Sequence, residues 1–344
     1  MDRTPAIRDI SFAAIAVAAV AALPALLDMF SLLQLTAFVC LAILSLSLGF
    51  IWGFGGILSF GQAAFFGIGG YAYAVAVINI GDSTLPLVLA LILPAAFAAL
   101  LGYLMFYGRV SDVYVGVITL TVTLILYNVM NSTAGDRYRI GLAPLGGFNG
   151  IPAVPGINIP LFPDMPLDVT GNWYLSAGCL AAIFFGMRYF LRTHVGRVVV
   201  ATRENEGRAA LLGYDTRFYK LLVFVIGGAV AGLGGALYTA WGAFVSPTVF
   251  GLGMSAQIIV WIIVGGRGTL AGPVLGCIAM QYVVTNLGTQ QTVNVNLVLG
   301  IVLLVSVLLL PLGVLPVFAG LMRKLPFSLA TRMRGHAMPR EGRR

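Results

Sequence analysis

Charged residues are scarce in this sequence, and their scarcity excludes most kinds of protein. Only 9% of the 344 residues are charged, whereas 59% are hydrophobic and the mean hydropathy is +0.97. A water-soluble globule of this length needs far more polar surface. We therefore expect a chain surrounded by lipid, folded as one membrane domain rather than as two soluble ones.

Lysine is almost absent, since Lys220 and Lys324 are the only two lysines. The P-loop of a nucleotide-binding site needs a Gly-Lys pair followed by Ser or Thr, and neither lysine follows a glycine. We therefore expect this chain to bind no cofactor of its own, and any ATP that drives it to bind to partner subunits.

The apolar stretches contain almost no acidic residue or histidine. All 12 acids and both histidines fall at expected helix ends, in loops or in tails. An ion-coupled carrier usually holds its ion with intramembrane Asp, Glu or His, and a membrane enzyme needs buried acid, base or metal-ligand groups. We expect neither a catalytic nor a metal site, while a stand-alone passive or ion-coupled carrier remains an alternative. Cys40, Cys179 and Cys277 lie far apart in apolar runs, so no disulfide or metal cluster is predicted.

Hydrophobic stretches predict an all-α polytopic transmembrane bundle of about 10 spans, with about 8 as the lower bound, because a span needs about twenty apolar residues. The predicted spans are residues 10–27, 31–51, 60–80, 85–107, 113–131, 173–191, 219–241, 253–265, 270–287 and 295–319. The first is longer than a signal-peptide core, so we expect it to be kept as an anchor. The span 253–265 is too short to cross upright and glycines follow it, so crossing and re-entry are both open.

The basic residues are distributed asymmetrically. In a soluble protein a net charge of +8 would favour nucleic-acid binding. Here every basic residue except Arg137 and Arg139 falls on one side of the predicted bundle, as positive-inside orientation requires. We therefore expect a multi-pass protein of the bacterial inner membrane, with both termini cytoplasmic, the lipid bilayer around it and no nucleic-acid partner.

The chain divides into a transmembrane domain over residues 1–322 and a basic cytoplasmic tail over residues 323–344. Residues 132–172 form a long extracytoplasmic loop rich in Pro, Gly and Asn. A docking surface and a simple connector are equally open roles for it. Residues 192–219 form the cytoplasmic loop.

Part of this cytoplasmic loop predicts one short amphipathic helix that displays both signs of charge. Thr202 is expected to cap its start, Glu204 to pair with Arg208, and Gly213 to end it in the left-handed conformation. Such a helix suits the groove of a partner, and a solvated connector is the alternative. The residues assigned to the partner contact are Arg203, Glu204, Asn205, Glu206, Arg208, Ala209, Leu212 and Gly213.

Glycine and uncharged polar residues within the apolar stretches indicate packing and a possible pathway. Gly228, Gly232, Gly234 and Gly235 predict a smooth helix face for close contact. A broken helix near residue 60 would expose backbone groups to a solute. The polar side chains would line its pathway, and hydrogen bonding between helices is the alternative role of each. The candidate pathway residues are Ser59, Gln62, Asn128 and Gln257.

Four stretches resemble the permease family of branched-chain amino-acid ABC importers, and the resemblance covers nearly the whole chain. They are Leu58–Tyr71, which begins Leu-Ser-Phe-Gly-Gln-Ala, Arg203–Gly213, Phe244–Pro247, and Gly265–Pro273. The glycine/proline motif of the family falls on Gly265, Gly266, Gly268, Gly272 and Pro273.

This resemblance implies a permease subunit, without an ATPase site of its own, in an ATP-driven importer of branched-chain or other hydrophobic amino acids. The implied partners are a second related permease, two cytoplasmic ATP-binding subunits and an extracytoplasmic solute-binding protein. Arg203–Gly213 would be the coupling helix, which transmits nucleotide-driven closure to the bundle. The family often has Thr where Leu145 stands, which leaves urea or short amides open as solutes.

Overall fold

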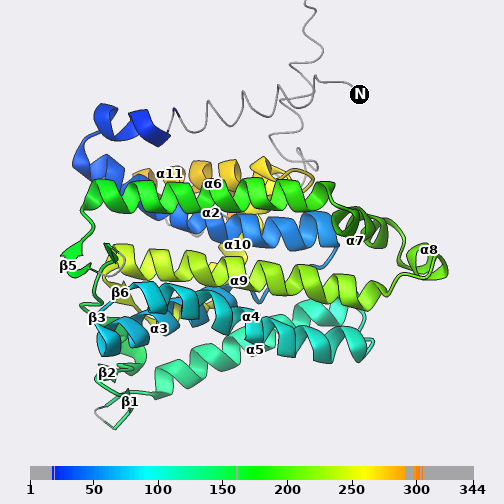
Figure 1. Ribbon diagram of the computed structural model, residues 1–344, viewed down its shortest axis with the longest axis horizontal. Helices are drawn as coiled ribbons and strands as arrows, with labels where there is room; N and C mark the ends of the chain where they lie inside the picture. The colour runs from blue at the N-terminus through cyan, green and yellow to red at the C-terminus, as the bar shows by residue number, and fades with distance from the viewer. Residues whose placement is uncertain are drawn as a thin grey trace, which may run out of the picture.

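The computed structural model describes residues 18, 20–135, 137–159, 162–290, 298, 300–302 and 304. Half of the predicted span 10–27 and most of the predicted span 295–319 lie outside these residues, and the predicted tail 323–344 lies wholly outside them. The described part of the chain is mostly helical, and its long helices run side by side in a bundle (Figure 1). The predicted all-α bundle is thereby confirmed in class.

Among the residues that the structure describes, six helices are long and apolar enough to cross a membrane. They are α2 (Met29–Gly55), α3 (Gln62–Ile80), α4 (Thr84–Tyr107), α5 (Asp112–Ser132), α6 (Val169–Arg192) and α9 (Thr216–Gly242). Each coincides with a predicted span to within a few residues. Two further predicted spans correspond to α10 (Leu252–Gly265) and α11 (Ala271–Gln290). Within the described residues, the apolar part of each is too short to cross a membrane by itself.

The helix α10 begins within the depth of the bundle rather than at its end. After α9 the chain passes through β6 (Phe244–Val245) and the 3-10 turn η2 (Pro247–Phe250). The Phe250 ring stacks on Tyr71 of α3 with ring centroids 5.7 Å apart. A Cβ built on Gly67 of α3 would overlap the same ring. These contacts indicate that residues 253–265 form a half-helix that does not cross the bundle upright by itself.

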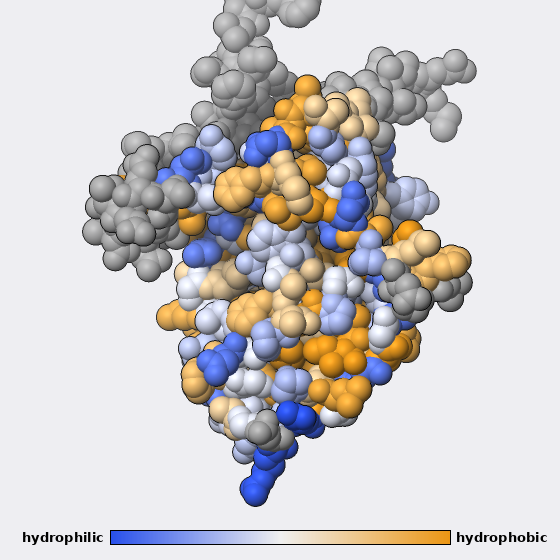
Figure 2. All heavy atoms as spheres, turned by 90° about the vertical axis from the view of Figure 1, so that its left-hand side faces the viewer, coloured by the Kyte–Doolittle hydropathy of each residue, from blue (hydrophilic) through white to orange (hydrophobic). Residues whose placement is uncertain are grey.

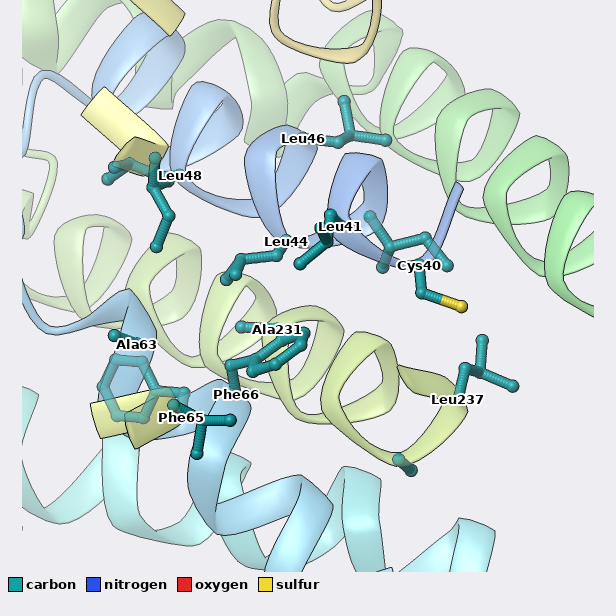
Figure 3. Packing of buried hydrophobic residues seen from close by; sticks show 14 of the residues in the cluster. Cys40, Leu41, Leu44, Leu46, Leu48, Ala63, Phe65, Phe66, Ala231 and Leu237 are labelled. Atoms are coloured by element: carbon teal, nitrogen blue, oxygen red, sulfur yellow. The ribbon is translucent and has the colours of Figure 1, made fainter. Parts of the chain in front are cut away.

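The helix α9 holds the centre of the bundle by packing on α2, α3 and α4. A Cβ on Gly69 of α3 would overlap the backbone of Gly232, and a Cβ on Gly235 would overlap the carbonyl of Phe66. Side chains from α2, α3 and α9 meet around these contacts (Figure 3). The predicted glycine face is therefore confirmed, since its glycines let the backbones of the helices touch.

Short strands gather at one end of the bundle, which we call the strand end (Figure 1). They are β1 (Arg139–Ile140), β2 (Ala143–Pro144), β3 (Ile151–Pro152), β4 (Asn158–Ile159), β5 (Phe162–Pro166) and β6, with the 3-10 turn η1 (Gly147–Asn149) between β2 and β3. The antiparallel pairs are β1 with β2, β3 with β6, and β4 with β5. The predicted extracytoplasmic loop is therefore an ordered cap, although its strands are too short to be seen in the sequence.

Asn158 fastens this cap to the turn between α3 and α4. Its Oδ1 accepts from the Ser83 amide at 2.7 Å, and its Nδ2 donates to the Asp82 carboxylate at 2.9 Å. The pKa of Asp82 is lowered because the Asn158 amide donates to its charged form. Because the pKa of Asp82 is lowered in the folded state, its contact with Asn158 stabilises the fold at pH values above the usual carboxyl pKa of about 4. This stabilisation is lost as the pH falls through the lowered pKa.

We expect Gly235→Ala to destabilise the bundle by about 1–3 kcal/mol, because the new methyl group would overlap the α3 backbone. The measurement is the melting temperature in detergent. Gly242→Ala is the matched control, because a Cβ at this position of the same helix meets no atom within 4 Å. Equal melting temperatures for the two variants would contradict the proposed close contact.

We expect Asn158→Leu to loosen the cap at neutral pH, because the Ser83 amide and the Asp82 carboxylate lose a buried partner. Amide hydrogen exchange over residues 139–159 should accelerate about fivefold, which corresponds to one lost hydrogen bond of about 1 kcal/mol. Asn149→Ala, an exposed change in the same loop, should leave the exchange unchanged. Equal exchange in both variants would show that Asn158 does not fasten the cap.

Candidate functional site

The predicted partner-contact segment lies opposite the strand end and forms two helices rather than one. They are α7 (His194–Glu204) and α8 (Glu206–Leu211), and the chain is extended at Asn205 between them. The Asn205 side chain accepts a 2.9 Å hydrogen bond from the Arg208 amide and so caps α8. We call this end of the molecule the α8 end, because α8 projects from it (Figure 1).

The prediction that Thr202 caps the segment is wrong. Thr202 lies inside α7, is buried, and its hydroxyl donates to the Val198 carbonyl at 2.9 Å. The cap of α7 is Thr193, whose hydroxyl accepts from the Gly196 amide at 3.2 Å. Because Thr202 is buried inside α7, its side chain cannot cap the start of a helix. Thr193 caps α7 and Asn205 caps α8.

The ends of the segment confirm one prediction and correct another. Gly213 has φ +88 and donates its amide back to α8, so its left-handed terminating role is confirmed. Glu204 pairs with Arg203 at 2.9 Å rather than with Arg208. The predicted pair required Glu204 and Arg208 to lie one turn apart on the same helix face. Because the helix breaks at Asn205, the two residues do not share a face.

The surface of α8 is mostly exposed. Only Ala209 among the α8 residues is buried, whereas Leu211 and Leu212 at its end are 90% and 77% exposed. Glu206 and Arg208 place both signs of charge beside these leucines. An exposed apolar tip with charged flanks has the character of a protein contact surface.

Arg203 joins this segment to α2. Its guanidinium donates to the carbonyl of Gly53, near the end of α2, and its side chain packs over Gly56. Arg267, in the turn after α10, meets the same place: its guanidinium lies 5.6 Å from the Trp52 ring centroid and its carbonyl fills the space beside Gly53. The segment and the turn therefore meet at the last turn of α2.

The glycine/proline motif forms the tight turn between α10 and α11. A Cβ on Gly265 would overlap the carbonyl of Gly272, and Gly266 ends α10 with φ +107. The Pro273 ring occupies the space beside Gly49 of α2, and the Ser45 hydroxyl donates to the Pro273 carbonyl at 2.8 Å. The motif thus packs this turn against α2. Gly268 differs from the others, because a Cβ there would meet no atom within 4 Å.

Lys220 of α9 joins α8 to α5. Its ammonium lies 2.7 Å from the carboxylate of Glu206 and 3.3 Å from that of Asp112, the first residue of α5. The Thr216 hydroxyl also donates to Glu206 at 3.1 Å. The Lys220 side chain is only 13% exposed. Water and salt therefore screen these ion pairs less than they screen a pair at the surface. A cleft of about 470 Å³ lies beside them, and Arg217 contributes to its lining.

Lys220 and Asp112 were not predicted as site residues. They are 108 positions apart, so only the fold brings them together. One signal was available, because Lys220 is one of only two lysines in a chain rich in arginine. Gly53 and Arg267 were likewise not identified.

The predicted pathway residues do not share one environment. Ser59 and Gln62 are both buried, Ser59 in the non-helical stretch between α2 and α3 and Gln62 as the first residue of α3, which runs unbroken to Ile80. The Ser59 hydroxyl accepts from the Gly61 amide at 3.1 Å. Asn128 is exposed on α5 and donates to the Leu124 carbonyl of its own helix at 2.9 Å. Gln257 is half-buried on α10.

Apolar spans, the ion pairs at the α8 end and a strand-bearing cap at the other end define a multi-pass helical membrane protein. Residues 31–308 match the family described as branched-chain amino acid transport system / permease component, and the chain belongs to that family. The resemblance found in the sequence is thereby confirmed.

Three relatives from two organisms illustrate the match. The chain is 30% identical over 258 residues to the high-affinity branched-chain amino acid permease protein LivM of Escherichia coli K12, covering 69% of this chain and 59% of the relative. It is 25% identical over 298 residues to a probable LivM of Methanocaldococcus jannaschii, covering 75% and 81%. It is also 27% identical over 222 residues to the ribose import permease protein RbsC of Escherichia coli K12, covering 61% and 63%.

This chain therefore spans 59% of the length of the Escherichia coli LivM that it matches. The relatives are named as permeases of transport systems rather than as enzymes. No solved structure matches the chain.

We expect Asn205→Ala to destabilise α8 by about 1 kcal/mol, because the Arg208 amide loses the side-chain oxygen that accepts its hydrogen bond. Hydrogen exchange over residues 206–212 should accelerate about fivefold. Asn205→Asp is the matched control, because Asp caps helices as well as Asn. If both variants exchange like the wild type, the Asn205 side chain does not cap α8.

Proposed function

We propose that this chain is a membrane-spanning permease subunit of an ATP-driven ABC importer for branched-chain or other hydrophobic amino acids. A second related permease would complete the pathway, two cytoplasmic subunits would bind the ATP, and an extracytoplasmic binding protein would deliver the solute. The family and its LivM relatives support the class of protein and of solute.

The observation that carries this proposal is the fastening of the segment Arg203–Gly213. It is exposed for contact with a partner, yet Arg203 ties it to α2 and Lys220 ties it to α5 and α9. A partner that moved α8 would therefore act on three membrane helices together. This is the property required of a coupling helix between an ATPase and a bundle without its own energy source.

The proposed orientation places the α8 end in the cytoplasm. Arg192–Lys220 at this end is rich in basic residues, whereas Arg137 and Arg139 lie at the strand end. Both termini would then be cytoplasmic in the bacterial inner membrane. We propose about 10 crossings, with η2 and α10 together forming one of them. Residues 1–322 would form the permease domain and 323–344 a basic tail.

The strand end would receive the binding protein. Hydrophobic side chains lie there in patches among hydrophilic ones, as the face in Figure 2 shows. Exposed apolar residues on this cap are Ile140, Leu142, Phe148 and Phe162. Apolar anchors among polar groups are typical of protein interfaces, which supports docking over a simple connector.

The solute is the finer part of the proposal. Urea and short amides stay open as alternatives, and the ribose permease relative favours testing sugars as well. Competition of leucine uptake by urea, acetamide or ribose would separate these classes. A stand-alone carrier, the alternative of another class, would transport solute as a purified chain in liposomes without ATP.

We expect Lys220→Met to reduce the amount of leucine taken up per ATP hydrolysed by about fivefold, a coupling loss of about 1 kcal/mol. The reason is that α8 loses its ion pairs to α9 and α5. The measurement is uptake and ATPase activity of the assembled importer in proteoliposomes, with assembly checked by size-exclusion chromatography.

Arg217→Met is the matched control, because Arg217 lines the same cleft and makes no ion pair among the described residues. An unchanged uptake-to-ATP ratio in Lys220→Met would remove the coupling role of this contact. Accumulation of leucine by the isolated chain without ATP would overturn the importer proposal itself.

A further inference from the structure

The last turn of α2 receives two arginines from different parts of the chain. Arg203, in the coupling segment Arg203–Gly213, donates to the Gly53 carbonyl. Arg267, in the turn between α10 and α11, places its guanidinium 5.6 Å from the centroid of the Trp52 ring. Arg203 pairs with Glu204, whereas Arg267 makes no ion pair among the described residues. The Trp52 ring is therefore the contact that holds the Arg267 side chain.

The way in which α2 ends leaves room for both arginines. The amides of Gly56 and Ile57 donate back to the helix in a Schellman motif, which leaves the Gly53 carbonyl without a partner within α2. Arg203 donates to this carbonyl. A Cβ on Gly53 would overlap the Arg267 carbonyl, and a Cβ on Gly56 would overlap the Arg203 side chain. Because cations are also stabilised at the carboxyl end of a helix, this turn suits two arginines.

The helices α10 and α11 form a hairpin whose two arms touch through their backbones. A Cβ on Gly276 of α11 would overlap the Trp261 carbonyl of α10, and a Cβ on Gly265 would overlap the Gly272 carbonyl. Such close packing leaves little play between the two helices. A displacement of the turn that carries Arg267 is therefore passed to both of them.

This hairpin lies along a stripe of small residues on α2. Ser45, Gly49 and Gly53 follow one another at a spacing of four, so they share one face of the helix. The Ser45 hydroxyl donates to the Pro273 carbonyl at 2.8 Å, and the Pro273 ring fills the space beside Gly49. A face without bulky side chains resists a shift of the hairpin only weakly. The Ser45 hydrogen bond and the ring contact of Arg267 therefore set the position of the hairpin on α2.

We propose that Arg267 is a positioning residue for coupling. It holds the α10–α11 hairpin to the same turn of α2 that Arg203 holds to the coupling segment. When the ATP-binding subunits move this segment, the last turn of α2 carries the hairpin with it. The inference rests on the proposed import function and adds α10 and α11 to the helices on which the coupling segment acts.

The first test is a double-mutant cycle across the ring contact, in the assembled importer in proteoliposomes. Arg267→Met and Trp52→Leu should each lower the leucine taken up per ATP hydrolysed by about threefold, as expected for a cation–π contact at an exposed arginine. The double variant should lose no more than either single one, because both changes remove the same contact. Arg267→Lys keeps the cation and should retain most of the wild-type ratio.

The control for this cycle is Arg109→Met, which changes an exposed arginine in the turn between α4 and α5 and should leave the ratio unchanged. Losses that multiply in the double variant would overturn the inference, because the two residues would then act separately. A loss in Arg267→Met without a loss in Trp52→Leu would also overturn it, because Arg267 would then act on another subunit directly.

The second test measures the movement itself and needs no solute. Spin labels are placed in pairs on the assembled importer, after the native cysteines have been replaced by alanine. One distance runs from α4 to α7 and the other from α4 to α11, with the labels on exposed positions: Leu100→Cys, Ala201→Cys and Leu275→Cys. A non-hydrolysable ATP analogue should change both distances in the wild type.

In Arg267→Met the change from α4 to α7 should persist. The change from α4 to α11 should shrink by about half, because a threefold weaker coupling lowers the population of the displaced state. An undiminished change from α4 to α11 in this variant would overturn the inference. A wild type in which α7 moves and α11 does not would overturn the inference alone, whereas a wild type in which neither moves would contradict the proposed function as well.

Discussion

The backbone contact between α9 and α3 is the constraint on which the rest of the structure depends. Lipid gives apolar helices little reason to associate, so close van der Waals packing must hold the bundle together. Gly69 meets the backbone of Gly232, and Gly235 meets the Phe66 carbonyl, at distances that no side chain would allow. These contacts fix α3 against α9, and α9 in turn packs on α2 and α4. This packing sets the position of the last turn of α2, which both Arg203 and Arg267 contact.

Charge has the complementary role, because it acts only where the bundle ends. The spans themselves are apolar, whereas Arg203 and Lys220 link the segment around α8 to α2, α5 and α9. Lys220 is mostly buried and binds two carboxylates, so a shift of Glu206 with α8 also disturbs the contact of Lys220 with Asp112 of α5. A moderate movement of α8 therefore cannot remain local. The glycine contacts make the bundle stiff, and the charged contacts give a partner a place to act on it.

The sequence predicted those features that depend on composition or on local spacing. Span positions follow from hydropathy because lipid demands about twenty apolar residues in any fold. The glycine face and the ending of α8 at Gly213 follow from the small size and positive φ of glycine. Features decided by tertiary contact were missed. Thr202 and Asn205 are both good helix caps, and only burial of Thr202 decides between them. The contact of Lys220 with Asp112 needs the whole fold.

The two tyrosines of α3 lie on opposite faces of the helix, and these two faces are held differently. Tyr73 is held by the Pro155 carbonyl of the cap, and Gly69 and Gly70 hold the same helix against α9. The helix α3 is thus fixed on that side. Tyr71 lies on the other side and stacks on the Phe250 ring of η2, the 3-10 turn that leads into the 14-residue helix α10. A short helix that follows an irregular turn can shift with less loss of contact than α3.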